Sequence, residues 1–219
     1  MLELFNEIDT TGLLLINGSH DAFQDVFWWN LGAGWAQALL LLSLLWVLLH
    51  QHWRHALLIV VLLVLSIVAA DLVSSGVKDL IGRLRPTFEP SLNGMVHTVN
   101  GYRGDMYGFI SSHAAGSFSI ATLVALVMRQ RLAAAAVFSW ALLKCYSRVY
   151  LGVHYPGDIL GGIVAGLVIG LLMWRLMLLL QRRFKVPSGC YSKTDGIVMM
   201  SAVLVTVAGL LVLAAVQVS

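Results

Sequence analysis

Charged residues are scarce in this sequence of 219 residues: Asp, Glu, Lys and Arg make up 11% of it, whereas hydrophobic residues make up 59%. A soluble domain of ordinary composition carries about 25% charged residues. The shortfall argues against a water-soluble domain, and the mean hydropathy of +0.84 agrees with that interpretation. We therefore expect most of the chain to lie in lipid.

Cysteine is scarce as well, since Cys145 and Cys190 are the only two and lie in separate segments. This spacing matches neither a disulfide framework nor a metal site.

Lys and Arg are absent from residues 1–27, which carry five acidic residues. A signal peptide begins with a basic region, so we do not expect this segment to be one. It is too polar to span a bilayer, and we expect one or two short helices at the membrane interface.

Six stretches are apolar and long enough to cross a hydrocarbon core of about 30 Å, at about 1.5 Å of rise per residue. They are residues 32–49, 56–77, 109–128, 132–150, 157–180 and 196–218. Lipid offers no water to the backbone, so each span must satisfy its own N–H and C=O groups. The sequence therefore predicts an all-α, polytopic membrane helical bundle in which residues 1–219 form a single membrane-embedded domain.

Two further patterns concern packing and loop structure. Gly162, Gly166 and Gly170 recur every four residues in the fifth span and share one stripe of that helix. Such a stripe predicts close approach by a neighbouring helix. The connection at residues 78–108 is rich in Gly, Pro, Asn and charge. That composition is typical of a polar loop of defined shape.

Ionisable and hydroxyl side chains gather where four of the spans begin or end. They are Lys78 and Arg85 after the second span, Ser111, Ser112 and His113 at the start of the third, and Arg148, His154 and Asp158 between the fourth and fifth. In a six-span chain these span ends all face one side of the membrane. Ionisable residues at such depth are costly and usually functional, so we expect them to converge on one site.

The cations and hydroxyls in this set suit a phosphate dianion. Arg85 and Arg148 can each direct two N–H groups at phosphate oxygens, and Lys78 adds a point charge. Ser111 and Ser112 lie at a helix start, where hydroxyls and free backbone N–H groups favour an anion. We therefore expect these five residues to bind the substrate phosphate.

The two histidines suit phosphoryl chemistry. A neutral imidazole can attack phosphorus when one ring nitrogen is free and the other is held by an acceptor. Asp158 lies four residues after His154 and can curl back to accept from it. His113 could then protonate the leaving oxygen.

At these positions the sequence resembles the type 2 phosphatidic acid phosphatase superfamily, which shares its site with vanadate haloperoxidases. The family's first and third motifs, Lys-x6-Arg-Pro and Ser-Arg-x5-His-x3-Asp, are matched in full by Lys78, Arg85, Pro86, Ser147, Arg148, His154 and Asp158. Its second motif, Pro-Ser-Gly-His, is matched only at Ser111 and His113, because Ile110 and Ser112 replace Pro and Gly. The resemblance covers about residues 70–165.

The resemblance implies a membrane lipid phosphatase that uses no metal ion and no other cofactor. By resemblance, His154 is the nucleophile that forms a phosphohistidine intermediate, Asp158 orients it, and His113 is the general acid. The expected partners are a lipid phosphate and the bilayer, with no nucleic acid and no obligate protein partner.

The substrate is left open among several lipids. Resemblance to small bacterial members favours undecaprenyl diphosphate, which would give the monophosphate. A lipid A phosphatase is the close alternative, followed by a phosphatidylglycerophosphate or phosphatidate phosphatase. A lipid-binding or transport protein on the same fold is the non-enzymatic alternative, but it would not need both histidines together with Asp158.

Charge also predicts the orientation in the membrane. Eight of the 14 basic residues lie opposite the predicted site, whereas ten of the 11 acidic residues lie on its side. Cytoplasmic segments carry the excess of Lys and Arg. We therefore expect a multi-pass protein of the bacterial inner membrane, with residues 50–55, 129–131 and 181–195 in the cytoplasm and the site facing the periplasm or the outside.

The roles of some charged residues near the site are open to two interpretations. Asp71 lies in the second span, seven residues before Lys78 and so on about the same face. It could be a charge partner near the site or could make a structural hydrogen bond. Glu89, Arg103 and Asp105 lie in the loop and could contact a headgroup or remain solvated.

Overall fold

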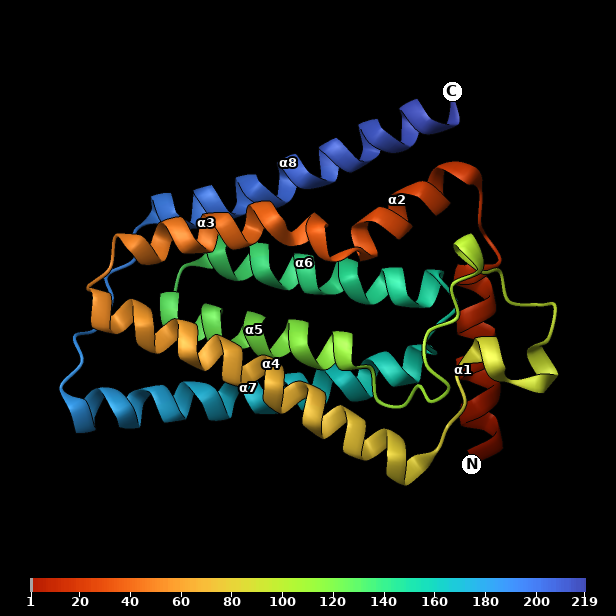
Figure 1. The fold of residues 1–219 in the computed structure, drawn as a ribbon, viewed down its shortest axis with the longest axis horizontal. Helices are drawn as coiled ribbons and strands as arrows, with labels where there is room; N and C mark the ends of the chain where they lie inside the picture. The colour runs from red at the N-terminus through yellow and green to blue at the C-terminus, as the bar shows by residue number, and fades with distance from the viewer. Residues whose placement is uncertain (1) are drawn as a thin grey trace.

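The computed structural model describes residues 2–219 as an all-α bundle with one helix across its end (Figure 1). The helices of the bundle are α2 (Ala22–Gly32), α3 (Ala38–Leu49), α4 (Trp53–Ile81), α5 (Ser112–Met128), α6 (Arg131–Tyr150), α7 (Pro156–Phe184) and α8 (Lys193–Val218). α5 lies at the centre, packed against α4, α6 and α7, while α8 packs against α2, α3 and α6. The predicted fold class, a multi-pass membrane bundle, is confirmed.

The expected count of six spans is not confirmed. Four helices, α4, α6, α7 and α8, are long and apolar enough to cross a membrane. The first expected span is interrupted at residues 33–37, where α2 and the helical segment 34–49 meet at a bend of 66°. The third is short, because α5 starts at Ser112 and has 17 residues, or about 26 Å.

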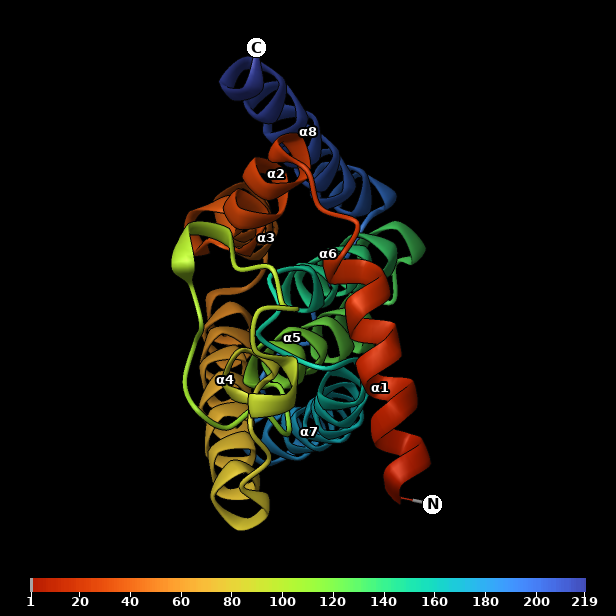
Figure 2. The same ribbon diagram turned by 90° about the vertical axis from the view of Figure 1, so that its right-hand side faces the viewer.

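The N-terminal segment forms one helix that lies across the end of the bundle. Figure 2 shows this helix, α1 (Leu2–Asn17), crossing in front of the ends of α6 and α7. Its Leu13 is fully buried, and its Asp9 and Asn17 are buried as well. A helix is thus present where the sequence predicts one, and its interfacial position stays a prediction, whereas α2 packs along α6 and α8.

The glycine stripe of α7 packs directly on α5, which confirms the expected close approach. A Cβ atom added to Gly162 would lie 2.5 Å from the carbonyl oxygen of Ser111, and one added to Gly166 would lie 2.5 Å from that of Ala115. No side chain fits at these positions. The two helices can therefore approach until the backbone N–H of Ser111 donates to the carbonyl of Asp158 at 3.0 Å. This contact places the start of α5 beside the start of α7.

The loop between α4 and α5 has a defined shape, as its composition predicts. α4 is followed by the capping residue Gly82, whose φ of +62° is a left-handed conformation that favours glycine. Three short 3-10 helices follow, Pro86–Phe88, Pro90–Leu92 and Val99–Gly101. An antiparallel bridge between Leu84 and Tyr107 then closes the loop over the end of the bundle.

Candidate active site

The predicted nucleophile, His154, lies in the turn between α6 and α7, its carboxylate partner Asp158 lies in the first turn of α7, and both are fully buried. His154 Nδ1 lies 3.3 Å from Asp158 Oδ2, which also accepts from the backbone N–H of Tyr155 at 3.0 Å. The carboxylate therefore stabilises the tautomer that carries its proton on Nδ1 and leaves the lone pair on Nε2.

The surroundings of His154 keep its imidazole neutral. Burial lowers the pKa of His154 to about 4, the bond to Asp158 opposes this shift, and the nearby Arg85 charge adds to it. Arg85 Nη1 donates to His154 Nε2 at 3.2 Å, which places a cation directly in front of the free ring nitrogen. The guanidinium is held there by the carbonyl oxygens of Tyr107 and Val153, at 3.1 and 3.2 Å.

The other two predicted cations lie around the same point. Arg148 is buried in the last turn of α6, and its guanidinium occupies the space where a side chain at Gly32 would begin. Lys78, in the last turn of α4, donates to Ser112 Oγ at 3.5 Å. The end of α4, the loop that follows it and the end of α6 thus bring three cations to one end of the bundle.

The two serines and His113 take different places at the start of α5. Ser111 is fully buried and its hydroxyl accepts from the backbone N–H of Ala114 at 3.4 Å, so it caps the helix. Ser112 and His113 instead line a cavity of about 410 Å³ between α4 and α5. His113 is exposed and has no hydrogen-bond partner among the described residues, but Arg148 and His154 lie close enough to interact with it electrostatically.

Arg83 and Asp9 belong to the site although the sequence analysis missed both. Arg83 donates to Asp158 Oδ1 at 2.9 Å and pairs with Asp9 Oδ2 at 2.7 Å. Asp9 Oδ1 accepts from the backbone N–H of Gly157 at 2.6 Å. A chain of contacts therefore runs from α1 through Arg83 and Asp158 to His154.

Only one of these two residues left a signal in the sequence. Arg83 lies two positions before Arg85, and residues two apart in an extended segment point to the same side. Asp9 has no such relation to the motifs, because it reaches the site only when α1 docks across the bundle.

A buried lysine was also missed. Lys144 lies one turn before Arg148 on α6, and its ammonium donates to the carbonyl oxygen of Gly32 at 2.9 Å. This carbonyl is at the C-terminal end of α2, where the helix dipole favours a cation. Lys144 thereby joins α6 to the bend between α2 and α3.

Of the ambiguous loop charges, Asp105 contacts the site. Its carboxylate is 91% exposed and lies 3.7 Å from the Arg85 guanidinium. Arg103 instead packs over the ring of Phe88 and donates to the carbonyl of Thr87, and Glu89 accepts from the hydroxyl of Ser91 at 3.2 Å.

A histidine–carboxylate cluster lies outside the predicted site. His20, Asp25 and His97 have ligand atoms within 4.8 Å of one another, a spacing that could hold a metal ion. The two imidazoles are stacked, however, with centroids 3.7 Å apart and planes within 6° of parallel. Their in-plane lone pairs cannot both point at one ion in this arrangement. Asp25 instead contacts His97 Nε2 at 2.9 Å and accepts from the hydroxyl of Tyr150 at 2.7 Å, which ties the loop to α2 and α6.

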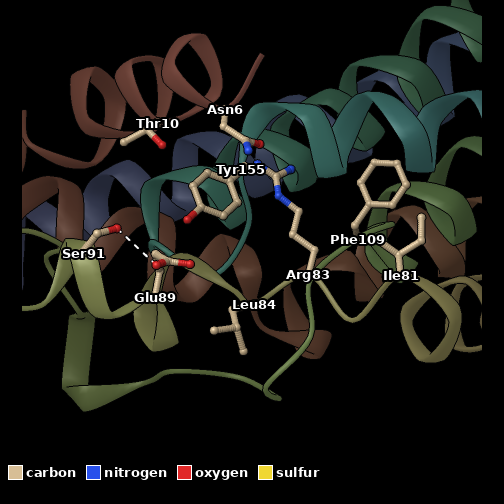
Figure 3. A pocket seen from close by; sticks show the side chains of 9 residues that line it. All are labelled: Asn6, Thr10, Ile81, Arg83, Leu84, Glu89, Ser91, Phe109 and Tyr155. Atoms are coloured by element: carbon tan, nitrogen blue, oxygen red, sulfur yellow. Dashed lines mark hydrogen bonds between the residues drawn. The ribbon is translucent and has the colours of Figure 1, made fainter. Parts of the chain in front are cut away.

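A second cavity lies beyond Asp158 from His154. Its volume is about 610 Å³, and Figure 3 shows Arg83 and Tyr155 in its wall, with Asn6 and Thr10 of α1 facing them. The Arg83 guanidinium packs over the Tyr155 ring at 4.1 Å from the ring centroid. Because Arg83 contacts Asp158 from this side, the cavity is behind His154 with respect to Arg85.

Comparison with known protein families gives a match to the PAP2 superfamily over residues 59–182. Two curated relatives carry the name lipid A 4'-phosphatase. The protein from Bacteroides thetaiotaomicron is 36% identical, and the alignment covers 99% of this chain and 100% of that protein. The one from Porphyromonas gingivalis is 32% identical, with 84% of this chain and 78% of that protein covered.

Two solved structures are similar to this one. Aquifex aeolicus LpxE has a TM-score of 0.58 and 25% sequence identity, over 74% of this chain and 92% of that chain. A transmembrane PAP2 type phosphatidylglycerolphosphate phosphatase from Bacillus subtilis has a TM-score of 0.62 over 82% of this chain and 89% of that chain. The latter is 20% identical and indicates the fold alone.

The contact between Arg83 and Asp158 can be tested by substitution. Arg83→Gln leaves the buried Asp158 Oδ1 without its cation, which loosens the hold on His154. We expect kcat for p-nitrophenyl phosphate to fall by about 10–100-fold, by analogy with the loss of carboxylate or carbonyl groups that orient histidine ligands in metal sites. KM should change much less, because Arg85 and Arg148 remain. Asp9→Asn should give a smaller loss in the same direction.

Arg182→Gln, the same substitution at an exposed position near the far end of α7, is the matched control. Wild-type kcat in Arg83→Gln would show that the contact has no role in the reaction.

Proposed function

This chain belongs to the PAP2 superfamily, and from that membership we propose that it removes the 4'-phosphate of lipid A. It is a membrane lipid phosphate phosphatase, and the finer assignment rests on one observation. The relative named lipid A 4'-phosphatase is 36% identical over the full length of both chains. The sequence alone favoured undecaprenyl diphosphate, but neither curated relative supports that substrate. Lipid A, the close alternative, therefore replaces it.

The geometry supports a phosphohistidine mechanism. In the proposal, Lys78, Arg85 and Arg148 bind the non-bridging oxygens of the phosphate. Arg85 then donates its hydrogen bond to the phosphate and no longer to His154 Nε2. The freed lone pair of Nε2 attacks phosphorus, and the P–O bond to the lipid breaks. Asp158 stabilises the positive charge that develops on the ring.

His113 completes the proton balance in this proposal. Protonated His113 gives its proton to the leaving oxygen of the lipid. The neutral imidazole then accepts a proton from water as that water attacks the phosphohistidine, which breaks the N–P bond and releases phosphate. The exposed position of His113 on the cavity side of the site is consistent with such a role.

We also propose that residues 1–219 act as one domain. The contact between Asp9 and Arg83 supports this, because it connects the first helix to the site. The substrate is a lipid in the bilayer. That no protein partner is required stays a prediction.

For orientation, we propose that the site faces the periplasm or the outside of a bacterial inner membrane, as the charge distribution favours. Cysteines at two exposed positions test this in a Cys190→Ser background, since Cys190 is itself exposed. Met95→Cys, in the loop at the site, should react with an impermeant maleimide in intact cells. Arg183→Cys, at the far end, should react only after permeabilisation, and the reverse pattern would invert the orientation.

The substrate assignment predicts a ranking of lipids. Detergent-solubilised protein should release phosphate from lipid A with a higher kcat/KM than from undecaprenyl diphosphate or phosphatidylglycerophosphate. Fragmentation mass spectrometry should place the loss at the 4' position. His154→Ala controls for contaminating phosphatase. A clear preference for undecaprenyl diphosphate would restore the substrate that the sequence alone favoured.

The two histidines should differ in their dependence on the leaving group. His154→Ala should abolish turnover of every substrate, because no phosphoenzyme can form. His113→Ala should lose about 10²–10⁴-fold on a lipid monophosphate, whose alkoxide needs a proton, the usual range for general acid catalysis. It should keep a much larger fraction on p-nitrophenyl phosphate, whose leaving group departs unprotonated.

The ratio of mutant to wild-type kcat/KM for each substrate is the measurement. Equal losses of His113→Ala on both substrates would indicate that His113 binds phosphate or shapes the site.

A further inference from the structure

A carboxylate lies in an apolar groove beside the site. The cavity of about 410 Å³ between α4 and α5 is lined by Ile67, Val68, Asp71, Leu72, Ser112, His113 and Gly116. In the part of the chain that the structure describes, the Asp71 carboxylate has neither a hydrogen bond nor an ion pair, because only its backbone oxygen accepts, from Ser74. The structural hydrogen bond that the sequence left open is therefore not made. An ionisable group at membrane depth is costly, which points to a role with a ligand.

The direction of attack connects this groove to the substrate. In phosphoryl transfer the attacking and leaving atoms lie roughly in line with phosphorus. His154 approaches with Nε2, so the leaving oxygen must depart on the side away from His154 and Asp158. The groove is lined by His113, which interacts electrostatically with His154, whereas the cavity of Figure 3 is lined by Arg83, which contacts the Asp158 oxygen that does not face His154. We therefore assign the departing oxygen to the groove.

The space in the groove is suitable for a bulky leaving group. Gly116 has no heavy atom within 4 Å of the place where a Cβ would stand, so the wall of α5 is open there. The helices α3 and α4 diverge from their connecting turn toward the site end, as Figure 1 shows. The groove residues Ile67, Val68 and Leu72 are each at least 47% exposed, so the groove opens on the surface of the bundle. A lipid can therefore remain in the bilayer while its phosphate reaches the cations.

We propose that this groove binds the leaving-group part of the substrate and that Asp71 determines which leaving groups are accepted. The inference rests on the proposed phosphatase function and specifies its substrate class. As a carboxylate, Asp71 accepts hydrogen bonds from a neutral, hydroxyl- or amide-bearing headgroup, the chemistry of an acylated amino sugar. It repels a leaving group that is itself an anion.

This electrostatic selection separates the candidate substrates by their leaving groups. Hydrolysis of a sugar phosphate releases a neutral sugar hydroxyl, whose neighbouring O–H and N–H groups can donate to Asp71. Hydrolysis of a lipid diphosphate releases a lipid monophosphate, whose negative charge would lie beside the carboxylate in a medium that screens it poorly. Asp71 therefore favours the former substrate and disfavours the latter.

Substitution at Asp71 tests both effects in the full-length, detergent-solubilised protein. Asp71→Ala should lower kcat/KM for lipid A by about 10–100-fold, as expected for loss of a hydrogen bond to a charged group. The loss should fall mainly on KM, and the loss on p-nitrophenyl phosphate should be much smaller. Asp71→Asn should raise the ratio of kcat/KM for undecaprenyl diphosphate to that for undecaprenyl monophosphate, two substrates with the same tail.

Two further variants make the test specific. Asp79→Asn removes the same charge from an exposed position on the same helix, outside the groove, and should leave both ratios at the wild-type value. Gly116→Leu adds a side chain where the structure has open space, so it should fold and should impair lipid A more than p-nitrophenyl phosphate.

Several results would overturn the inference. Equal losses of Asp71→Ala on lipid A and p-nitrophenyl phosphate would mean that Asp71 supports the fold or the phosphate site. If Asp71→Ala lowers kcat/KM equally for all lipids but not for p-nitrophenyl phosphate, Asp71 acts through His113. If wild-type protein does not hydrolyse lipid A, the proposed substrate fails, but the ratio of diphosphate to monophosphate still decides the role of Asp71.

Discussion

The buried carboxylate of Asp158 is the interaction on which the site depends. Both of its oxygens are used: Oδ2 faces His154 and the backbone N–H of Tyr155, and Oδ1 faces Arg83. A buried charge is stable only when it is paired and hydrogen-bonded. Removing one partner would therefore disturb the others. Because Arg83 also pairs with Asp9, the surroundings of Asp158 depend on the helix across the end of the bundle as well.

Close packing of two helices sets the positions of the remaining groups. The glycines of α7 allow α5 to approach until backbone meets backbone, which brings the start of α5 beside Asp158. His113 then lines the groove between α4 and α5, and Lys78 reaches Ser112 from α4. The distances between the cations and the histidines are thus consequences of helix packing at membrane depth, where close approach of helix backbones favours association.

The two sides of His154 differ in chemistry, and this difference orients the reaction. On one side lie Asp158, Arg83 and Asp9, where each charge has a partner. On the other lie the cations that suit phosphate and the groove with Asp71, whose carboxylate makes neither a hydrogen bond nor an ion pair among the described residues and acts on Lys78 only electrostatically. Behind the nucleophile, the charges of the site are paired with one another. In front of it, charges remain available to a ligand. This arrangement suits a bound phosphate and allows selection among the groups attached to that phosphate.

Much of this protein follows from the sequence by itself. Low charge and long apolar runs determine a membrane bundle, because lipid forces the backbone to bond within helices. Short fixed spacings, such as the four residues from His154 to Asp158, identify groups that must meet, because they lie within one turn of chain. Only the tertiary structure decided the rest. Lys144 reached the carbonyl oxygen of Gly32, and Asp9 reached Arg83 across 74 positions of sequence. No local spacing encodes that contact, since it depends on how α1 docks against helices that form independently of it.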